Sequence, residues 1–211
     1  MAKIDFRKTL KPLYAAGTAF ALVEVPKMQF VKIDGRGDPN TAAEYRTGLQ
    51  WLYTVSYTLN FASKKRGKDY VVPPLESLWF ADDMTAFRRQ AKSEWHWTQM
   101  IMVPDWISAD DFSKAVSQAA PKLGEPPATL RLEPYAEGLS VQFMHIGPWA
   151  DEGPMIARMH DEFLPAHGLS PSGQHHEIYL SDPRRTPPAK LKTIVRQPVR
   201  KAAAKKTRKA A

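Results

Sequence analysis

The sequence of 211 residues contains no cysteine. This absence excludes disulfide bonds, thiolate metal sites and cysteine nucleophiles, and it is typical of a protein from a reducing compartment. The sequence also has no apolar run near the roughly 18 residues that a membrane-spanning helix requires. Its first residues are too charged for a secretory signal. We therefore expect a cytoplasmic protein. We also expect one domain, because the chain is long enough to bury a single core.

Most of the chain has nearly balanced charge, and the basic excess lies at its end. There are 30 basic and 22 acidic residues, but the segment 200–211 holds six of the basic ones and no acid, which leaves 24 against 22. A segment rich in Ala, Lys and Arg is typical of a disordered tail with weak, salt-sensitive contacts to polyanions. The body 1–199 shows no helix-turn-helix or zinc finger, so we expect neither a specific nucleic acid nor a membrane as a partner.

Motifs of several common enzymes are missing as well. Gly35-Arg-Gly37 lacks the third glycine of a dinucleotide loop, and the chain has neither a Lys-Ser/Thr phosphate loop nor the G-x-S-x-G turn of serine hydrolases. His175 and His176 are adjacent, and neighbours in a strand point to opposite faces, so they cannot ligate one metal together. We expect no metal and no cofactor.

The predicted elements of the first half, about 15–104, are an opening β segment in two runs, a glycine turn, a helix and two further strands. The strands are expected at 20–25, 28–33, 75–80 and 95–103, and the helix is expected from a capping box at Thr41 and Glu44 to the polar cluster 63–68. Pro26 separates the first two strands and indicates a bend or an edge strand.

The second half, about 125–199, repeats this order after an amphipathic helix at 108–123 that joins the halves. A strand is expected at 139–146, a helix at 154–164, and strands at 177–180 and 192–196. The repeated order predicts an α+β fold of two strand-helix-strand-strand units with a pseudo-twofold duplication.

Tryptophan and tyrosine gather on the predicted strands, turns and first helix. These residues are Tyr53, Tyr57, Trp79, Trp95, Trp97, Trp106 and Trp149. Two interpretations are open. The rings either fill the core, or they line a pocket for a flat, hydrophobic or cationic ligand, because a buried indole N–H needs a hydrogen-bond partner and an aromatic face attracts cations.

Glu177 begins the short apolar strand Glu177-Ile-Tyr-Leu180. Alternation along a strand places Glu177 and Tyr179 on one face. If that face is solvated, Glu177 is an ordinary surface residue. If it is interior, Glu177 is a partly desolvated carboxylate with a raised pKa that could pair with a cation or take a proton from water.

Several segments together resemble one protein family. The segment His176-Glu-Ile-Tyr-Leu-Ser-Asp-Pro-Arg184 is similar to the C-terminal signature of GyrI-like small-molecule-binding proteins, and in particular of the stand-alone branch without a DNA-binding domain. The other matching segments, in chain order, are 5–11, 23–28, 33–40, 74–79, 97–101, 144–148, 189–192 and 196–199. The resemblance therefore extends over nearly the whole chain before the basic tail.

The resemblance implies a fold of two strand-helix-strand-strand units, known as tandem SHS2, with a ligand cleft between them. In drug-binding regulators of the family a glutamate lies at the floor of an aromatic pocket, and Glu177 occupies that place. Some stand-alone members hydrolyse DNA-alkylating cyclopropanoid natural products and so detoxify them. The chain departs from the family pattern at Ser77, where glycine is usual, and at Val103, where a polar residue is common.

Two functions remain open from the sequence. The first is a detoxifying hydrolase that adds water to a cyclopropanoid, with Glu177 as base and Tyr179, Tyr53 or His145 as proton donor. The pocket residues expected in either case are Tyr53, Tyr57, Trp79, Trp97, Met100 and Trp149. The alternative is a non-catalytic module that binds hydrophobic or cationic aromatic small molecules, or a protein partner as a gyrase inhibitor does. The oligomeric state is left open.

Overall fold

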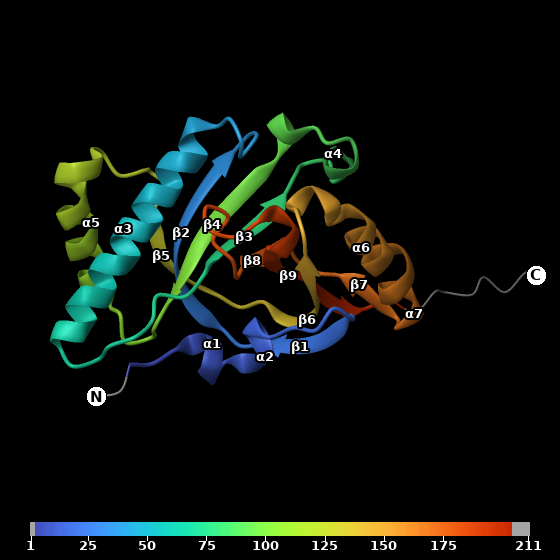
Figure 1. Cartoon of the computed structure of the whole chain (residues 1–211), viewed down its shortest axis with the longest axis horizontal. Coiled ribbons are helices and arrows are strands. Elements are labelled where there is room, and N and C mark those ends of the chain that lie inside the picture. Colours follow the sequence, from blue (N-terminus) through green and yellow to red (C-terminus); the bar gives the residue numbers. More distant parts are fainter. Residues whose placement is uncertain (1–2, 204–211) are drawn as a thin grey trace, which may run out of the picture.

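One antiparallel sheet forms the centre of the molecule, which the computed structural model describes over residues 3–203 (Figure 1). The strands are β1 (Ala21–Val25), β2 (Met28–Arg36), β3 (Leu75–Phe80), β4 (His96–Val103), β5 (Arg131–Tyr135), β6 (Gly138–Ile146), β7 (Leu169–Pro171), β8 (His175–Tyr179) and β9 (Lys192–Lys201). Eight of them lie in the order β1-β6-β9-β8-β3-β4-β2-β5, and β7 pairs with the end of β9.

Helices of very different length connect these strands. They are α1 (Phe6–Thr9), α2 (Lys11–Tyr14), α3 (Ala43–Lys65), α4 (Thr85–Arg88), η1 (Lys92–Glu94), α5 (Ala109–Leu123), η2 (Trp149–Asp151), α6 (Gly153–Arg158), the π-helical turn η3 (Met159–Phe163), α7 (Leu164–Ala166) and η4 (Pro188–Lys190). The turn η3 continues α6 into α7, so 153–166 form one helical run with a π-bulge. Within residues 3–203, no helix is long and apolar enough to cross a bilayer.

The strand order is symmetric about the β3–β8 pair. Exchanging β1 with β5, β2 with β6, β3 with β8 and β4 with β9 simply reverses the order. The first strand of each predicted half pairs with the other half, β1 with β6 and β5 with β2. Pro26 lies between β1 and β2, which have different partners in the sheet. The chain therefore bends at Pro26, as predicted. The halves therefore interlock across one sheet.

Both long helical runs cover the same face of this sheet. Paired residues point to the same face of a sheet, and the pairings Val195–Glu177–Ser77–Gln99–Ile33 run across five strands. Ile33 is buried under α3, and Val195 is buried under the run 153–166. We call this side of the sheet the helix face and the other side the opposite face.

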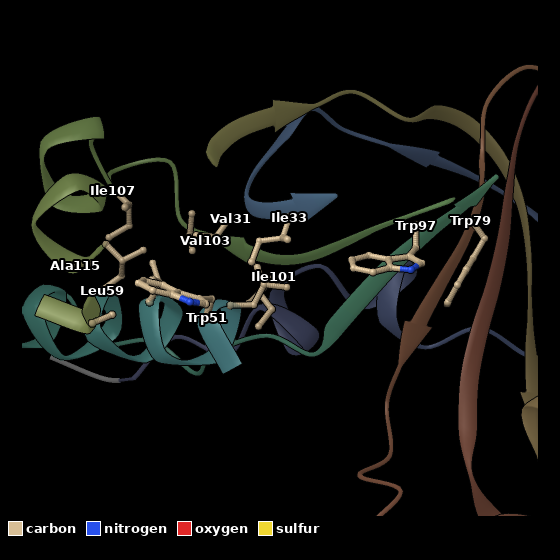
Figure 2. Packing of buried hydrophobic residues seen from close by; sticks show 13 residues of the cluster. Val31, Ile33, Trp51, Leu59, Trp79, Trp97, Ile101, Val103, Ile107 and Ala115 are labelled. Carbon is tan, nitrogen blue, oxygen red and sulfur yellow. The ribbon is translucent and has the colours of Figure 1, made fainter. Parts of the chain in front are cut away.

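On the helix face of the first half, α3 buries one apolar side against the sheet (Figure 2). Trp51 and Leu59 of α3 are in one cluster with apolar residues of β2 and β4, and α5 packs beside α3. Trp79 and Trp97 lie at the end of this cluster that is farthest from Ala115 of α5. The main core thus ends in two indole rings near the middle of the sheet.

The opposite face is covered only in part by the N-terminal helices. Leu13 and Tyr14 of α2 are buried against Ile178 of β8 and Ile194 of β9. Beside them, strands β2 to β5 border a cavity of about 620 Å³, with Lys32, Arg131 and other residues of this face in its lining. The two faces of the sheet therefore have different coverings at the centre of the molecule.

The predicted capping box at Thr41 and Glu44 is wrong. The helix α3 begins at Ala43, and its N-cap Ala42 has no side-chain capping bond. The carbonyl of Asp38 instead accepts from the amides of Thr41 and Ala42, so a turn after Gly37 takes the place of the cap. A capping box does occur at the start of α5.

Two strands were not predicted, and several strands extend beyond their predicted ends, β9 the farthest, to Lys201. Strand β5 contains Pro134, which a sheet tolerates there because β5 is an edge strand with one partner. Strand β7 holds the end of β9, where Leu169 and Ser170 pair with Lys201 and Arg200. The predicted tail 200–211 is therefore corrected, because its first two residues are part of the sheet. The rest of it, from residue 204, lies outside the described residues.

Candidate functional site

Strand β8 places three polar side chains in a row on the helix face. Tyr179 Oη donates to Glu177 Oε2 at 2.8 Å, and His175 Nε2 lies 3.2 Å from Glu177 Oε1. The side chain of Glu177 is only 14% exposed, so the interior interpretation of the strand is correct. The carboxylate is held from both sides by residues two positions away on its own strand, as period-two alternation allows.

Two tryptophan side chains flank Tyr179. Trp79 Nε1 donates to Tyr179 Oη at 3.1 Å, so the indole, the phenol and the carboxylate form one chain of hydrogen bonds. The ring of Trp149 meets that of Tyr179 edge-on at 5.6 Å, and Trp149 Nε1 donates to Thr193 Oγ1 at 3.1 Å. Each indole N–H thus has a partner, and the rings form walls beside Glu177.

The structure adds a second carboxyl group, Glu152, that the sequence did not reveal. Glu152 stands between η2 and α6, is 3% exposed, and lies beside Glu177 and Thr193. Burial, followed by the nearby charge of Glu177, raises the pKa of Glu152 well above neutral. In the sequence Glu152 is an acid between a turn and a predicted helix, which is usually solvated, and only the tertiary fold brings it to β8.

We therefore infer that the two carboxyl groups hold one proton between them at neutral pH. Burial and the neighbouring charge raise the pKa of Glu152 to about 10, and two like charges side by side in a buried site are costly. We place the proton on Glu152, because burial raises its pKa, whereas Glu177 receives a hydrogen bond from Tyr179 and faces His175. We call Glu152 and Glu177 the carboxyl pair.

Tyr45 of α3 completes the aromatic surroundings, and it was not among the predicted site residues. Its ring stacks on Trp79 at 6.2 Å and meets Trp97 edge-on at 5.0 Å. Burial raises the pKa of Tyr45, with Glu177 contributing to the same direction. Tyr45 falls within the helix predicted to begin near Thr41, but helical periodicity alone does not distinguish a core residue from a pocket residue.

Several predicted site residues do not line an accessible surface beside Glu177. Trp97 is fully buried, and its ring fills the space where a side chain at Gly35 would stand, so it supports the wall from behind. Met100 lies on the opposite face with Phe30 and Leu78. The sequence did not reveal this, because every residue of β4 after His96 is buried and the burial pattern does not distinguish the two faces. Met100 is therefore not part of this site.

The alternative proton donors are also placed elsewhere or already engaged. His145 Nε2 donates to the carbonyl of Pro148 at 3.0 Å and so stabilises the turn before Trp149. Tyr53 and Tyr57 stack on each other at 6.5 Å on the outer side of α3, where they are 39% and 48% exposed. The hydroxyl of Tyr179 is bound to Glu177.

No metal centre is formed by the part of the chain that the structure describes, since no three His, Asp or Glu side chains are suitably grouped. The cavity of about 620 Å³ on the opposite face contains none of the predicted site residues in its lining. The chemistry of the helix face therefore depends on the carboxyl pair and the surrounding rings.

The family model of the GyrI-like small molecule binding domain matches residues 18–200. The chain belongs to the GyrI-like family. This match confirms the resemblance drawn from the sequence motifs, and the structure confirms the α+β fold class. Members of the family carry a domain that binds small molecules, so the aromatic surroundings of the carboxyl pair are the natural place to look for a ligand.

Two solved structures from Listeria innocua are similar over nearly the whole chain. One is an uncharacterized conserved protein with 36% identity and a TM-score of 0.87, and the match covers 94% of this chain and 100% of that one. The other is a hydrolase encoded by lin2189, with 36% identity, a TM-score of 0.84 and the same coverage. The C-terminal domain of EcmrR is 12% identical to this chain, with a TM-score of 0.56. The match covers 87% of this chain and 98% of the EcmrR domain, and at this identity it shows a shared fold alone. Among curated proteins, no sequence matches.

Proposed function

We propose that this GyrI-like protein is a hydrolase that adds water to cyclopropanoid genotoxins. The observation that carries the proposal is the carboxyl pair, in which Glu152, with its raised pKa, lies beside Glu177 between aromatic walls. A reaction that needs a base and an acid in one step requires two groups in opposite protonation states. The hydrolase from Listeria innocua, at 36% identity, supports the same reaction class.

The proposed step begins when Glu177 takes a proton from water and the water oxygen attacks a cyclopropane carbon. The strained C–C bond breaks, and its electron pair moves through the conjugated dienone to the dienone oxygen. That oxygen takes the proton of Glu152. The product contains one added water, and no other reactant is consumed. The proton then passes from Glu177 to the neighbouring Glu152, which restores the carboxyl pair.

Glu152 replaces the donors expected from the sequence for a physical reason. Burial and the neighbouring Glu177 raise the pKa of Tyr179 well above its ordinary value, and its proton is committed to Glu177. A phenol of this kind is a weak acid toward a substrate. The rings of Trp79 and Trp149 would instead hold the planar substrate in line with the carboxyl pair, which is the positioning contribution to the rate.

The test is the conversion of a cyclopropanoid alkylator in water enriched in oxygen-18, followed by mass spectrometry. We expect one labelled oxygen in a ring-opened product with the wild-type protein. Glu177→Gln and Glu152→Gln should each lower turnover by at least about a hundredfold, the typical contribution of a positioned acid or base. Glu162→Gln is the matched control, because that carboxylate is 71% exposed on η3. Turnover that is equal in all four proteins would contradict the proposal.

A non-catalytic binder is the second candidate, and the geometry gives it one specific support. The single negative charge of the carboxyl pair lies beside Trp149, which is 44% exposed, and this arrangement suits an aromatic cation. Under this function Glu177→Gln should weaken binding of a lipophilic aromatic cation and leave a neutral analogue unaffected. Fluorescence titration of both ligands, together with the absence of a ring-opened product, would favour the binder over the hydrolase.

A further inference from the structure

A second group of charged side chains lies directly behind the carboxyl pair, on the opposite face of the same strands. We propose that this buried ionic cluster positions the carboxyl pair, an inference that rests on the proposed function of that pair. The cluster consists of Tyr14, Glu76, Glu137, Gln142, His176 and Arg196. Its four charged side chains are each at most 1% exposed.

His176 stands at the centre of the cluster, between two carboxylates. Its Nδ1 lies 2.9 Å from Glu137 Oε1, and its Nε2 lies 3.0 Å from Glu76 Oε2. The contact with Glu137 is a hydrogen bond, whereas that with Glu76 is an ion pair outside hydrogen-bond alignment. Tyr14 Oη donates to the other oxygen of Glu76 at 3.0 Å. The imidazole therefore bridges β3 and the connection between β5 and β6.

Arg196 of β9 connects the cluster to the N-terminal segment. Its Nη1 donates to Glu137 Oε2 at 3.1 Å, and its Nε and Nη2 both donate to Gln142 Oε1 at 3.0 Å. Its Nη2 also donates to the carbonyl of Leu13 at 2.7 Å. Gln142 Nε2 in turn donates to the carbonyl of Pro12 at 2.7 Å. The cluster therefore binds β6, β8, β9 and β3 to the N-terminal segment.

The charges of the cluster balance only if His176 is protonated. Burial lowers the pKa of His176, but the carboxylates of Glu137 and Glu76 outweigh it and raise the pKa to about 9. Burial likewise raises the pKa of Glu137, yet His176 and Arg196 bring it below its ordinary value. Two carboxylates thus face one imidazolium and one guanidinium, and the cluster is neutral.

Neighbours in sequence connect the cluster to the site through the sheet. His176 and Glu177 are adjacent on β8, and Glu76 and Ser77 are adjacent on β3. Ser77 pairs directly with Glu177, so the distance of Glu177 from Trp79 depends on the register of β3 and β8. The ion pair from Glu76 to His176 joins the same two strands from the opposite side. A shift of this register would carry Glu177 away from the walls of the first half.

Stability alone does not account for such a cluster. Removing two ion pairs from water has a large desolvation cost, and buried pairs can be replaced by apolar residues of similar volume without loss of stability. What a fully connected buried network does give is one arrangement of the strands rather than several. The β3–β8 pair, where the two halves of the sheet meet, is the place where a fixed arrangement matters for the carboxyl pair.

The test compares Glu76→Gln with Ile194→Val, a buried apolar change on the same face. Glu76→Gln keeps the size of the side chain but removes the charge that faces His176. We expect its kcat to fall about tenfold or more with KM nearly unchanged, because small displacements of a reacting group are costly to the rate. Ile194→Val should leave kcat unchanged. The two variants are compared at temperatures equally far below their own melting temperatures, so that lost stability alone does not explain a difference in kcat. Equal turnover in the two variants would overturn the proposal.

A second measurement keeps this inference separate from the proposed hydrolysis. Trp149 and Trp79 both contact Tyr179, so tryptophan emission followed against pH should report ionisation of the carboxyl pair without any substrate. The midpoint should move in Glu76→Gln and stay in place in Ile194→Val. If Glu76→Gln does not fold, Tyr14→Phe removes only the hydroxyl and is expected to move the midpoint in the same direction by less. An unchanged midpoint in every folded cluster variant would refute the positioning role, whether or not the protein hydrolyses a cyclopropanoid.

Discussion

The two faces of β3 and β8 each hold two buried glutamates, but they neutralise them differently. On the opposite face, Glu76 and Glu137 are balanced by His176 and Arg196. On the helix face, no lysine or arginine among residues 3–203 contacts Glu152 or Glu177, although His175 lies 3.2 Å from Glu177, and the inferred shared proton takes the place of a fixed cation. A guanidinium held by four hydrogen bonds stays where it is, whereas a proton between two carboxyl groups can leave. The face with the proton is therefore the one suited to chemistry.

The largest effect on stability is expected on the ionic side of this comparison. Arg196→Met leaves Glu137 without its guanidinium and should lower the free energy of unfolding by about 3–5 kcal/mol, the usual cost of an uncompensated buried charge. Arg158→Met, at a side chain that is 61% exposed, is the control and should change it by less than about 0.5 kcal/mol. Urea unfolding measures both. Equal losses of unfolding free energy in the two variants would show that Glu137 does not depend on the charge of Arg196.

The pH dependence of stability should distinguish the two faces. A pKa that is higher in the folded state than in the unfolded state means that the folded state holds the proton more tightly. The contribution of such a group is complete at acid pH and is lost as pH rises. For Glu152 the loss begins above its ordinary pKa of 4.5 and continues toward its raised folded value. For His176 it begins above 6.5 and is complete only beyond about 9.

Glu152→Gln removes the first of these two losses and keeps the second. The variant should be more stable than the wild type at pH 8 by at least about 1 kcal/mol, since it no longer disfavours the ionised carboxyl. Below pH 4 the two proteins should differ little. Thermal unfolding at several pH values measures this, and a variant that is less stable than the wild type at pH 8 would show that Glu152 is ionised in the folded protein.

The smallest effect is expected at the end of the chain, outside both groups of glutamates. Truncation after Ala203 should leave the free energy of unfolding within about 0.5 kcal/mol of the wild type. Truncation after Val199 should cost more, because it removes the pairs of Arg200 and Lys201 with β7. The two melting temperatures decide where the sheet ends, and no difference between them would return the boundary to residue 199.

Period-two alternation was sufficient to predict the half of the site that lies on one strand. Glu177 and Tyr179 share a face because they are two residues apart, and no tertiary information is needed for that. Glu152 could not be found in this way, since its contact with Glu177 depends on how the run 153–166 returns to the sheet. Met100 was misplaced because β4 is buried on both faces and so carries no polar alternation.

Much of the fold was predictable for a similar reason, and the prediction failed at defined points. The order of strands and helices follows from local patterns, and the bend at Pro26 follows from the geometry of proline. The ionic cluster follows from neither, because Tyr14, Glu76 and Arg196 lie far apart in the sequence and no local pattern connects them. Only the pairing of β3 with β8 shows that they meet.

The most direct test of the central claim is a titration of the shared proton itself. Glutamate labelled with carbon-13 at the side-chain carboxyl allows each carboxyl group to be followed by NMR from acid to alkaline pH. The account predicts one carboxyl that is neutral at pH 7 and ionises only well above it, whose signal is absent from Glu152→Gln and whose pKa falls in Glu177→Gln. If every glutamate instead ionises in the ordinary range near pH 4, the carboxyl pair does not share a proton and the proposed acid has nothing to donate.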